Sequence, residues 1–184
     1  MNLQSIKKSI IHGIVVRGTL DGALPRNLIY KKKITTAQRK AFRRYLSYQL
    51  ERLFQEILGK KTYTDEDHYR VIFRFANKVS RHKTFRTYLV QNRLRVGTAQ
   101  KLINLYWKMN WLLKPGVKAP LHCPFDRIII QELDSAVHDI RWTLSDNIDD
   151  YKRLVAAARQ RSGKMSMAKW ELDTYGQKTI PDMG

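Results

Sequence analysis

The chain has 184 residues, 43% of them hydrophobic, and its 35 Lys and Arg outnumber its 16 Asp and Glu, for a formal net charge of +19. This composition supports one compact domain or two small lobes and excludes a disordered tail. The single cysteine, Cys123, excludes an internal disulfide and a cysteine-rich zinc site. No apolar run approaches the roughly 20 residues that cross a bilayer. We therefore expect a soluble, intracellular (cytoplasmic) protein with no metal or small-molecule cofactor.

Helical periodicity accounts for most of the chain and predicts an all-α fold. From residue 37 to 58 apolar residues recur at three- and four-residue spacing. Thr35 or Thr36 can cap the start of this helix, and Gly59 can end it. The stretches that predict helices are, in chain order, 1–12, 37–58, one starting at 64–67, a short one after Thr84, one from Thr98 to Leu113, 125–133 and 148–158.

Three stretches do not fit this periodicity. Residues 13–25 hold three glycines and a proline, which indicates irregular chain with a short strand at 14–16. The prolines of 114–124 predict an extended connection. We therefore expect a helical domain over 1–162, followed by a tail or arm over 163–184 that is either frayed or packed.

The basic side chains gather in the first two thirds of the chain. Residues 1–60 and 61–120 each hold 13 basic and 3 acidic side chains, whereas residues 121–184 hold 9 and 10. Such an excess of positive charge steers a protein toward phosphate backbones, so a nucleic acid is the expected partner. A ribosomal or assembly role and an anionic membrane surface are alternatives, although no clean apolar helical face supports membrane binding.

The first carboxylate after a long basic stretch is Asp126. The 58 residues from His68 to Phe125 contain no Asp or Glu and twelve Lys and Arg. One interpretation of Asp126 is a helix cap directly after Pro124. The other is chemistry on the nucleic acid, in which a carboxylate stabilises the cation that develops when an N-glycosidic bond breaks.

A lysine can complete this chemistry. An amine that attacks the sugar carbon forms a Schiff base, which leads on to strand scission. Lys101, near the start of the helix that follows Gly97, is the candidate amine. The alternative for Lys101 is a simple phosphate contact or a solvated surface side chain.

These residues resemble a known family. The segment from Arg95 to Lys101, an apolar helix, a proline-containing linker and then Pro124-Phe125-Asp126 are similar to the core of the helix-hairpin-helix DNA glycosylases, most of all the archaeal 8-oxoguanine glycosylase branch. The resemblance covers about 35 residues. It implies a compact, two-lobed helical fold with a helix-hairpin-helix-like element and double-stranded DNA bound across a cleft, a damaged or modified base being flipped out.

The remaining candidate residues follow from this hypothesis. A monomeric enzyme of this kind would hold DNA phosphates through a turn and several basic side chains: Arg95, Gly97, Thr98, Arg81, His82, Lys83, Arg86 and Lys118. A flipped base would stack in a pocket of Trp107, Trp111, His122 and Phe125, for which core packing is the alternative.

Two functions therefore stand as hypotheses. The first is a DNA glycosylase, with or without lyase activity, in which Asp126 and Lys101 are catalytic. The second is a non-catalytic helical protein that binds DNA or RNA through the same basic surface. The acidic groups at 65–67 and 146–150 could be nuclease metal sites, but both fall where helix starts favour negative charge.

Overall fold

The computed structural model describes residues 2–24 and 29–179, and over these residues the fold is all-α. No β-sheet forms in the described ranges, where a single antiparallel bridge joins Tyr30 and Leu89. The helices are α1 (Leu3–Ala23), α2 (Thr36–Leu58), α3 (Asp65–Arg81), the 3-10 turns η1 (Phe85–Tyr88) and η2 (Val90–Asn92), α4 (Val96–Leu113), α5 (Arg127–Gln131), the 3-10 turn η3 (Ser135–Val137), α6 (Ile148–Ser162) and α7 (Met167–Thr179).

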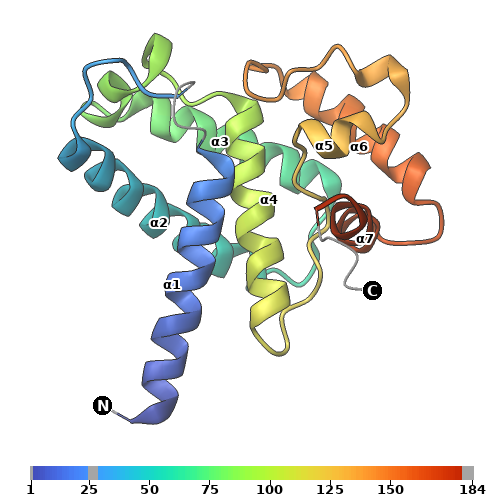
Figure 1. Ribbon diagram of the computed structural model, residues 1–184, viewed down its shortest axis with the longest axis horizontal. Helices are drawn as coiled ribbons and strands as arrows, with labels where there is room; N and C mark the ends of the chain where they lie inside the picture. Colours follow the sequence, from blue (N-terminus) through green and yellow to red (C-terminus); the bar gives the residue numbers. More distant parts are fainter. Residues whose placement is uncertain (1, 25–28, 180–184) are drawn as a thin grey trace.

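Helix α4 is the centre of the arrangement (Figure 1). It packs against α1, α2 and α3 and also contacts α6, while α5 and α6 both contact α7. In Figure 1 the N-terminal end of α1 projects away from the other helices, and α5, α6 and α7 lie on the opposite side of α4 from α2. No helix in the described part of the chain has both the length and the apolar character that a membrane crossing requires.

The prediction that the first helix ends at residue 12 is wrong, because α1 continues without interruption to Ala23. Glycine is normally unfavourable inside a helix, but here two glycines let α1 approach α4 closely. A Cβ at Gly22 would lie 2.7 Å from Leu105 Cδ2, and one at Gly18 would lie 3.0 Å from Met109 Cε. Gly18 and Gly22, two of the three glycines that suggested an irregular segment with a strand at 14–16, are therefore packing residues.

The starts of α2 and α3 lie where the sequence predicted them, and both carry complete side-chain caps. Thr35, rather than Thr36, caps α2 and forms a capping box with Gln38, and Gly59 follows the last turn. Thr64 and Asp67 form the corresponding box at the start of α3. Each box satisfies two backbone N–H groups that the helix itself leaves unpaired.

The C-terminal third differs from the expectation at two points. The helix expected over 125–133 is shorter, because α5 spans only Arg127–Gln131 and its cap is Asp126. The segment expected as a tail or arm contains α7, whose Trp170 and Glu171 are buried. For residues 163–179 the structure shows the packed alternative, and residues 180–184 lie outside the described residues.

Helix α4 is buried on nearly all sides, since 13 of its 18 residues are buried. Several of these are polar and need partners inside the protein. Asn104, which is fully buried, donates to the carbonyl of Cys123 (3.0 Å) and to the hydroxyl of Tyr151 (3.0 Å), and its own oxygen lies 2.7 Å from His68 Nε2. A hydrogen-bonded network therefore joins α3, α4, α6 and the connection before α5.

Two buried imidazoles belong to this network. His68 and His122 are fully buried, with ring centroids 4.7 Å apart. Burial lowers the pKa of His68 to about 3 and that of His122 to about 4; the neighbouring His122 adds to the first shift, and Asp65 opposes the second. Both rings are therefore neutral in the folded protein at neutral pH.

This arrangement predicts a loss of stability in mild acid. The unfolded chain binds protons on these histidines below about pH 6.5, whereas the folded chain resists protonation until lower pH. The free energy of unfolding should be at its full value above about pH 6.5. It should be lower by about 2 kcal/mol per histidine at about pH 5. Thermal unfolding followed by circular dichroism between these values measures the effect.

A His138→Gln variant is the control, because His138 is exposed. It should keep the wild-type pH dependence, whereas His122→Gln should flatten it. An unfolding temperature that stays constant down to about pH 5 would contradict the prediction.

Candidate active site

The structure brings Lys101 and Asp126 together. Lys101 lies in the second turn of α4 and Asp126 immediately before α5, and Lys101 Nζ is 3.2 Å from Asp126 Oδ2. The other carboxylate oxygen accepts the backbone N–H of Ile129 at 3.1 Å and caps α5. The side chains are 11% and 18% exposed, respectively. The pair is therefore largely shielded from water but still reaches the surface.

Gln100 fixes the backbone that carries Asp126. Its side-chain amide donates to the carbonyl of Phe125 at 2.8 Å, and its oxygen accepts the N–H of the same residue at 3.2 Å. With the bond from Asn104 to Cys123, these contacts attach the connection to α4 at two points. Gln100 was not predicted as a site residue, although an amide directly beside Lys101 on a mostly apolar helix was a visible signal.

Trp142 covers the lysine. Its ring centroid lies 4.5 Å from Lys101 Nζ, which is within the range of a cation–π interaction. The segment around Trp142 is held against the start of α4, where the N–H of Gly97 donates to the carbonyl of Ser145 at 3.0 Å. A Cβ at Gly97 would lie 1.7 Å from the Trp142 carbonyl oxygen, so only glycine permits this approach.

The predicted phosphate-binding turn is occupied by the chain itself. The Gly97 amide is bonded to Ser145, Thr98 is buried, and Arg95 donates to the Leu144 carbonyl (2.8 Å) and to Asp146 (3.0 Å). These three residues lie together, but the donors of Gly97 and Arg95 face residues 144–146. Contact with a phosphate there would require that segment to move.

A second lysine–carboxylate pair is more deeply buried. Lys108, seven residues beyond Lys101 on α4, lies 2.7 and 2.8 Å from the two carboxylate oxygens of Glu171 on α7. Burial raises the pKa of Glu171, and the Lys108 ammonium opposes this shift. Glu171 was not predicted as a site residue, because it lies in the segment expected as a tail or arm.

The lone cysteine lies inside the same region. Cys123 is fully buried, and burial raises the pKa of its thiol well above the usual range. The charge of Glu171 adds to this shift and that of Lys108 opposes it, which places the thiol near the second pair. In this state Cys123 is an unreactive core residue.

The residues predicted to form a base pocket do not line one cavity. His122 and Phe125 are fully buried, and Phe125 packs against Tyr151 at a centroid distance of 5.7 Å. Trp107 is also buried, and its indole N–H donates to the Lys118 carbonyl at 3.0 Å. Trp111 is partly exposed. His122, Phe125 and Trp107 are therefore core residues, which was the alternative to a base pocket.

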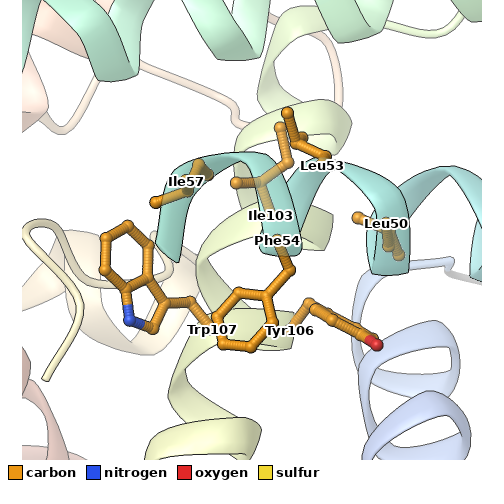
Figure 2. Close-up of a pocket in the computed structure, with 7 residues that line it drawn as sticks. All are labelled: Leu50, Leu53, Phe54, Ile57, Ile103, Tyr106 and Trp107. Carbon is orange, nitrogen blue, oxygen red and sulfur yellow. The ribbon is translucent and has the colours of Figure 1, made fainter. Parts of the chain in front are cut away.

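The cavity beside Trp107 is too small for a base (Figure 2). Its volume is about 10 Å³, room for about one water molecule. Apolar and aromatic side chains from α2 and α4 line it: Leu50, Leu53, Phe54, Ile57, Ile103, Tyr106 and Trp107. Neither Lys101 nor Asp126 lines this cavity or any of four further pockets in the described part of the chain.

The predicted basic cluster lies where α3 ends. Arg81, Lys83 and Arg86 are exposed, and His82 stacks on Phe85 with centroids 4.4 Å apart. Lys118 is exposed on the connection between α4 and α5. The structure thus leaves these cations accessible but places them on elements other than α4 and α5, which carry Lys101 and Asp126.

The acidic groups act within the chain. Asp65 lies 3.1 Å from His122 Nε2 and also pairs with Arg159, while Asp146 pairs with Arg93 and Arg95. Among the residues that the structure describes, no group of three or more His, Cys, Asp or Glu side chains is placed to hold a metal ion.

Comparison with known proteins adds no relative: no family model matches the chain, and neither the curated proteins nor the solved structures give a match.

The contact between Gly97 and Trp142 generates a prediction. Gly97→Ala should destabilise the protein by about 1–3 kcal/mol, because the added methyl group meets backbone rather than a flexible side chain. Chemical denaturation measures the change. Gly13→Ala is the matched control, since its Cβ would meet nothing within 4 Å, and it should be neutral or stabilising by up to about 1 kcal/mol. Equal stability of the two variants would contradict the close approach at Gly97.

Proposed function

We propose that this protein is a DNA glycosylase with lyase activity, in which Lys101 and Asp126 act on the sugar that carries a damaged or modified base. One observation carries the proposal. An amine and a carboxylate, 25 residues apart in the sequence, lie 3.2 Å from each other at the start of two helices, mostly shielded yet not sealed from solvent.

The pair matches the needs of this reaction. As the N-glycosidic bond breaks, the sugar becomes positively charged, and the Asp126 carboxylate can stabilise that charge. Lys101 Nζ then bonds to the sugar carbon C1′ while the base leaves with the electron pair of the broken bond. Asp126, within hydrogen-bond distance, can accept the proton that the amine loses.

The nitrogen lone pair then breaks the C1′–O4′ bond, so that the sugar ring opens to an iminium and O4′ takes up the proton held by Asp126. This iminium permits strand scission. Removal of a proton from C2′ expels the 3′ phosphate and leaves an unsaturated sugar attached through nitrogen, which water releases from the lysine. A basic side chain is needed at the C2′ step, and Asp126 is the nearest carboxylate to the reacting amine. The reaction needs no oxidant or reductant.

Access to Lys101 in this proposal runs past Trp142. Its partly exposed ring covers the ammonium at 4.5 Å, so a flipped base would displace this ring or stack on it. Trp142 therefore replaces the buried Trp107, His122 and Phe125 as the aromatic group proposed to contact the base.

The expected partner is double-stranded DNA, held by a monomer inside the cell. The net charge of +19 and the exposed cations at the end of α3 support attraction to a phosphate backbone. In this proposal α1, α2 and α3 form one lobe, α5, α6 and α7 the other, and DNA crosses the edge where Lys101 and Asp126 reach the surface.

Asp126→Asn tests the carboxylate. Asparagine also caps helices well, so the fold should persist. Base release from duplexes that each carry one oxidised, alkylated or deaminated base should fall at least about 100-fold, whereas DNA affinity should be unchanged or higher because one negative charge is removed.

Asp134→Asn is the matched control, because Asp134 caps the exposed turn η3 through Ala136 N–H. It should release the base at the wild-type rate. Wild-type release by Asp126→Asn would overturn the role of Asp126.

Borohydride trapping tests the amine. Wild-type protein should form a covalent adduct with duplex DNA that contains an abasic site, whatever base the enzyme excises. Lys101→Arg keeps the positive charge beside Asp126 but cannot form the Schiff base, so its adduct should disappear. Lys164→Arg, on the exposed turn between α6 and α7, should form the adduct as wild type does. Denaturing gel electrophoresis resolves the adduct.

A second candidate function is a non-catalytic nucleic-acid-binding protein. One observation favours it: Lys101 and Asp126 satisfy each other, and the second oxygen of Asp126 caps α5. A purely structural pair would look the same. DNA binding without base release from any duplex and without a trapped adduct would establish this function in place of the glycosylase.

A further inference from the structure

A groove between α2 and α3 combines exposed cations with aromatic rings. One hollow, of about 540 Å³, is lined by Tyr45, Phe73, Arg74, Asn77, Lys78, Arg81 and His82. A second hollow, of about 150 Å³, continues it along the same two helices and shares Arg74 and Lys78. We propose that this groove binds single-stranded nucleic acid, at a site separate from Lys101 and Asp126.

The cations of the groove are regularly spaced and available. Arg74, Lys78 and Arg81 follow one another at four- and three-residue intervals, which places them along one face of α3. All three are exposed, and none forms an ion pair within the described chain. This differs from Arg70, one turn earlier on the same helix, which pairs with Glu66 at 3.3 Å.

Phe73 gives the groove a stacking surface. The core side of α3 consists of Ile72, Phe75, Ala76 and Val79, and Phe73 lies off that side with 47% of its surface exposed. A single exposed apolar side chain is ordinary on a protein surface, but this one lies in a hollow with three unpaired cations.

Two further rings line the same hollow. Tyr45 and His82 have centroids 4.8 Å apart, and both pack on Phe85, at 4.6 and 4.4 Å. Packing holds these rings in place at one end of the hollow. Fixed aromatic rings next to a row of cations are the features with which proteins bind unpaired bases and their phosphates.

The occupant is a single strand rather than a duplex. Bases in a duplex are stacked on each other and present no face to Phe73, whereas the bases of a single strand do. An acidic peptide would use the cations but would gain nothing specific from a planar ring. The one carboxylate that lines the groove, Glu56, is paired with Arg52 at 3.8 Å.

Fluorescence anisotropy with a labelled oligothymidylate of about 12 nucleotides tests the proposal. Phe73→Ala and Phe73→Leu should each weaken binding about tenfold or more, whereas Phe73→Trp should bind as wild type does. The reason is that stacking requires a ring and not only apolar bulk. Leu112→Ala is the control, since Leu112 is similarly exposed (45%) on α4 and should bind as wild type does.

Salt dependence tests the cations. Arg74→Ala and Lys78→Ala should each lower the slope of log affinity against log salt by about 0.7, the value for one phosphate contact on a single strand. Arg161→Ala, at the exposed end of α6, should leave the slope unchanged. Parallel measurements with oligouridylate identify whether the natural strand is DNA or RNA.

Binding by all Phe73 variants within twofold of wild type would overturn the proposal, as would weakening of duplex and single strand by the same factor. The test is independent of the glycosylase, because Asp126→Asn should bind the oligothymidylate as wild type does. Loss of base release in Asp126→Asn therefore concerns only the proposed glycosylase. Loss of single-strand binding in Phe73→Ala concerns only the groove, because base release is measured in a separate assay.

Discussion

The organisation of this protein depends on the polar side chains buried along α4. A helix enclosed on nearly every side must find internal partners for Gln100, Asn104 and its two inner lysines, because an unpaired buried polar group costs several times what a hydrogen bond contributes. The connection before α5 meets this requirement with the backbone groups of Cys123 and Phe125. The position of Asp126 is thus a result of how the core is satisfied.

The carboxylates of the C-terminal third have a related role. Glu171 and Asp126 each meet a lysine of α4, and Asp146 meets Arg93 and Arg95 just before it. Negative charge from residues 121–184 therefore compensates the cations that face inward. The cations of α3 that face the groove receive no such compensation, so their charge remains available to an anionic ligand.

Local signals explain which elements the sequence predicted well. The starts of α2 and α3 depend on Thr35 with Gln38 and on Thr64 with Asp67, which are contacts within a few residues of chain. The glycines of α1 were misinterpreted, because their meaning depends on Leu105 and Met109, more than 80 residues away. A residue that breaks a helix in isolation can permit close packing in a folded chain.

The same limit applies to the candidate site. The pair of Lys101 and Asp126 could be proposed from the sequence, since each stands out against the residues around it. Its neighbours could not: Glu171 reaches α4 through α7, and Trp142 reaches Lys101 because Gly97 leaves room for its backbone. The aromatic residues close to Lys101 and Asp126 in sequence are instead needed in the core, where His122, Phe125 and Trp107 are buried.

The burial of Cys123 has a practical consequence. Cys123 lies in the segment that ends in Asp126; its thiol is fully buried, and its carbonyl accepts a hydrogen bond from Asn104 of α4. A thiol reagent can reach this sulfur only when the packing around it opens, and the chain holds no second cysteine to obscure the signal. The rate of alkylation therefore reports how often the structure around the segment that carries Asp126 opens, without any added label.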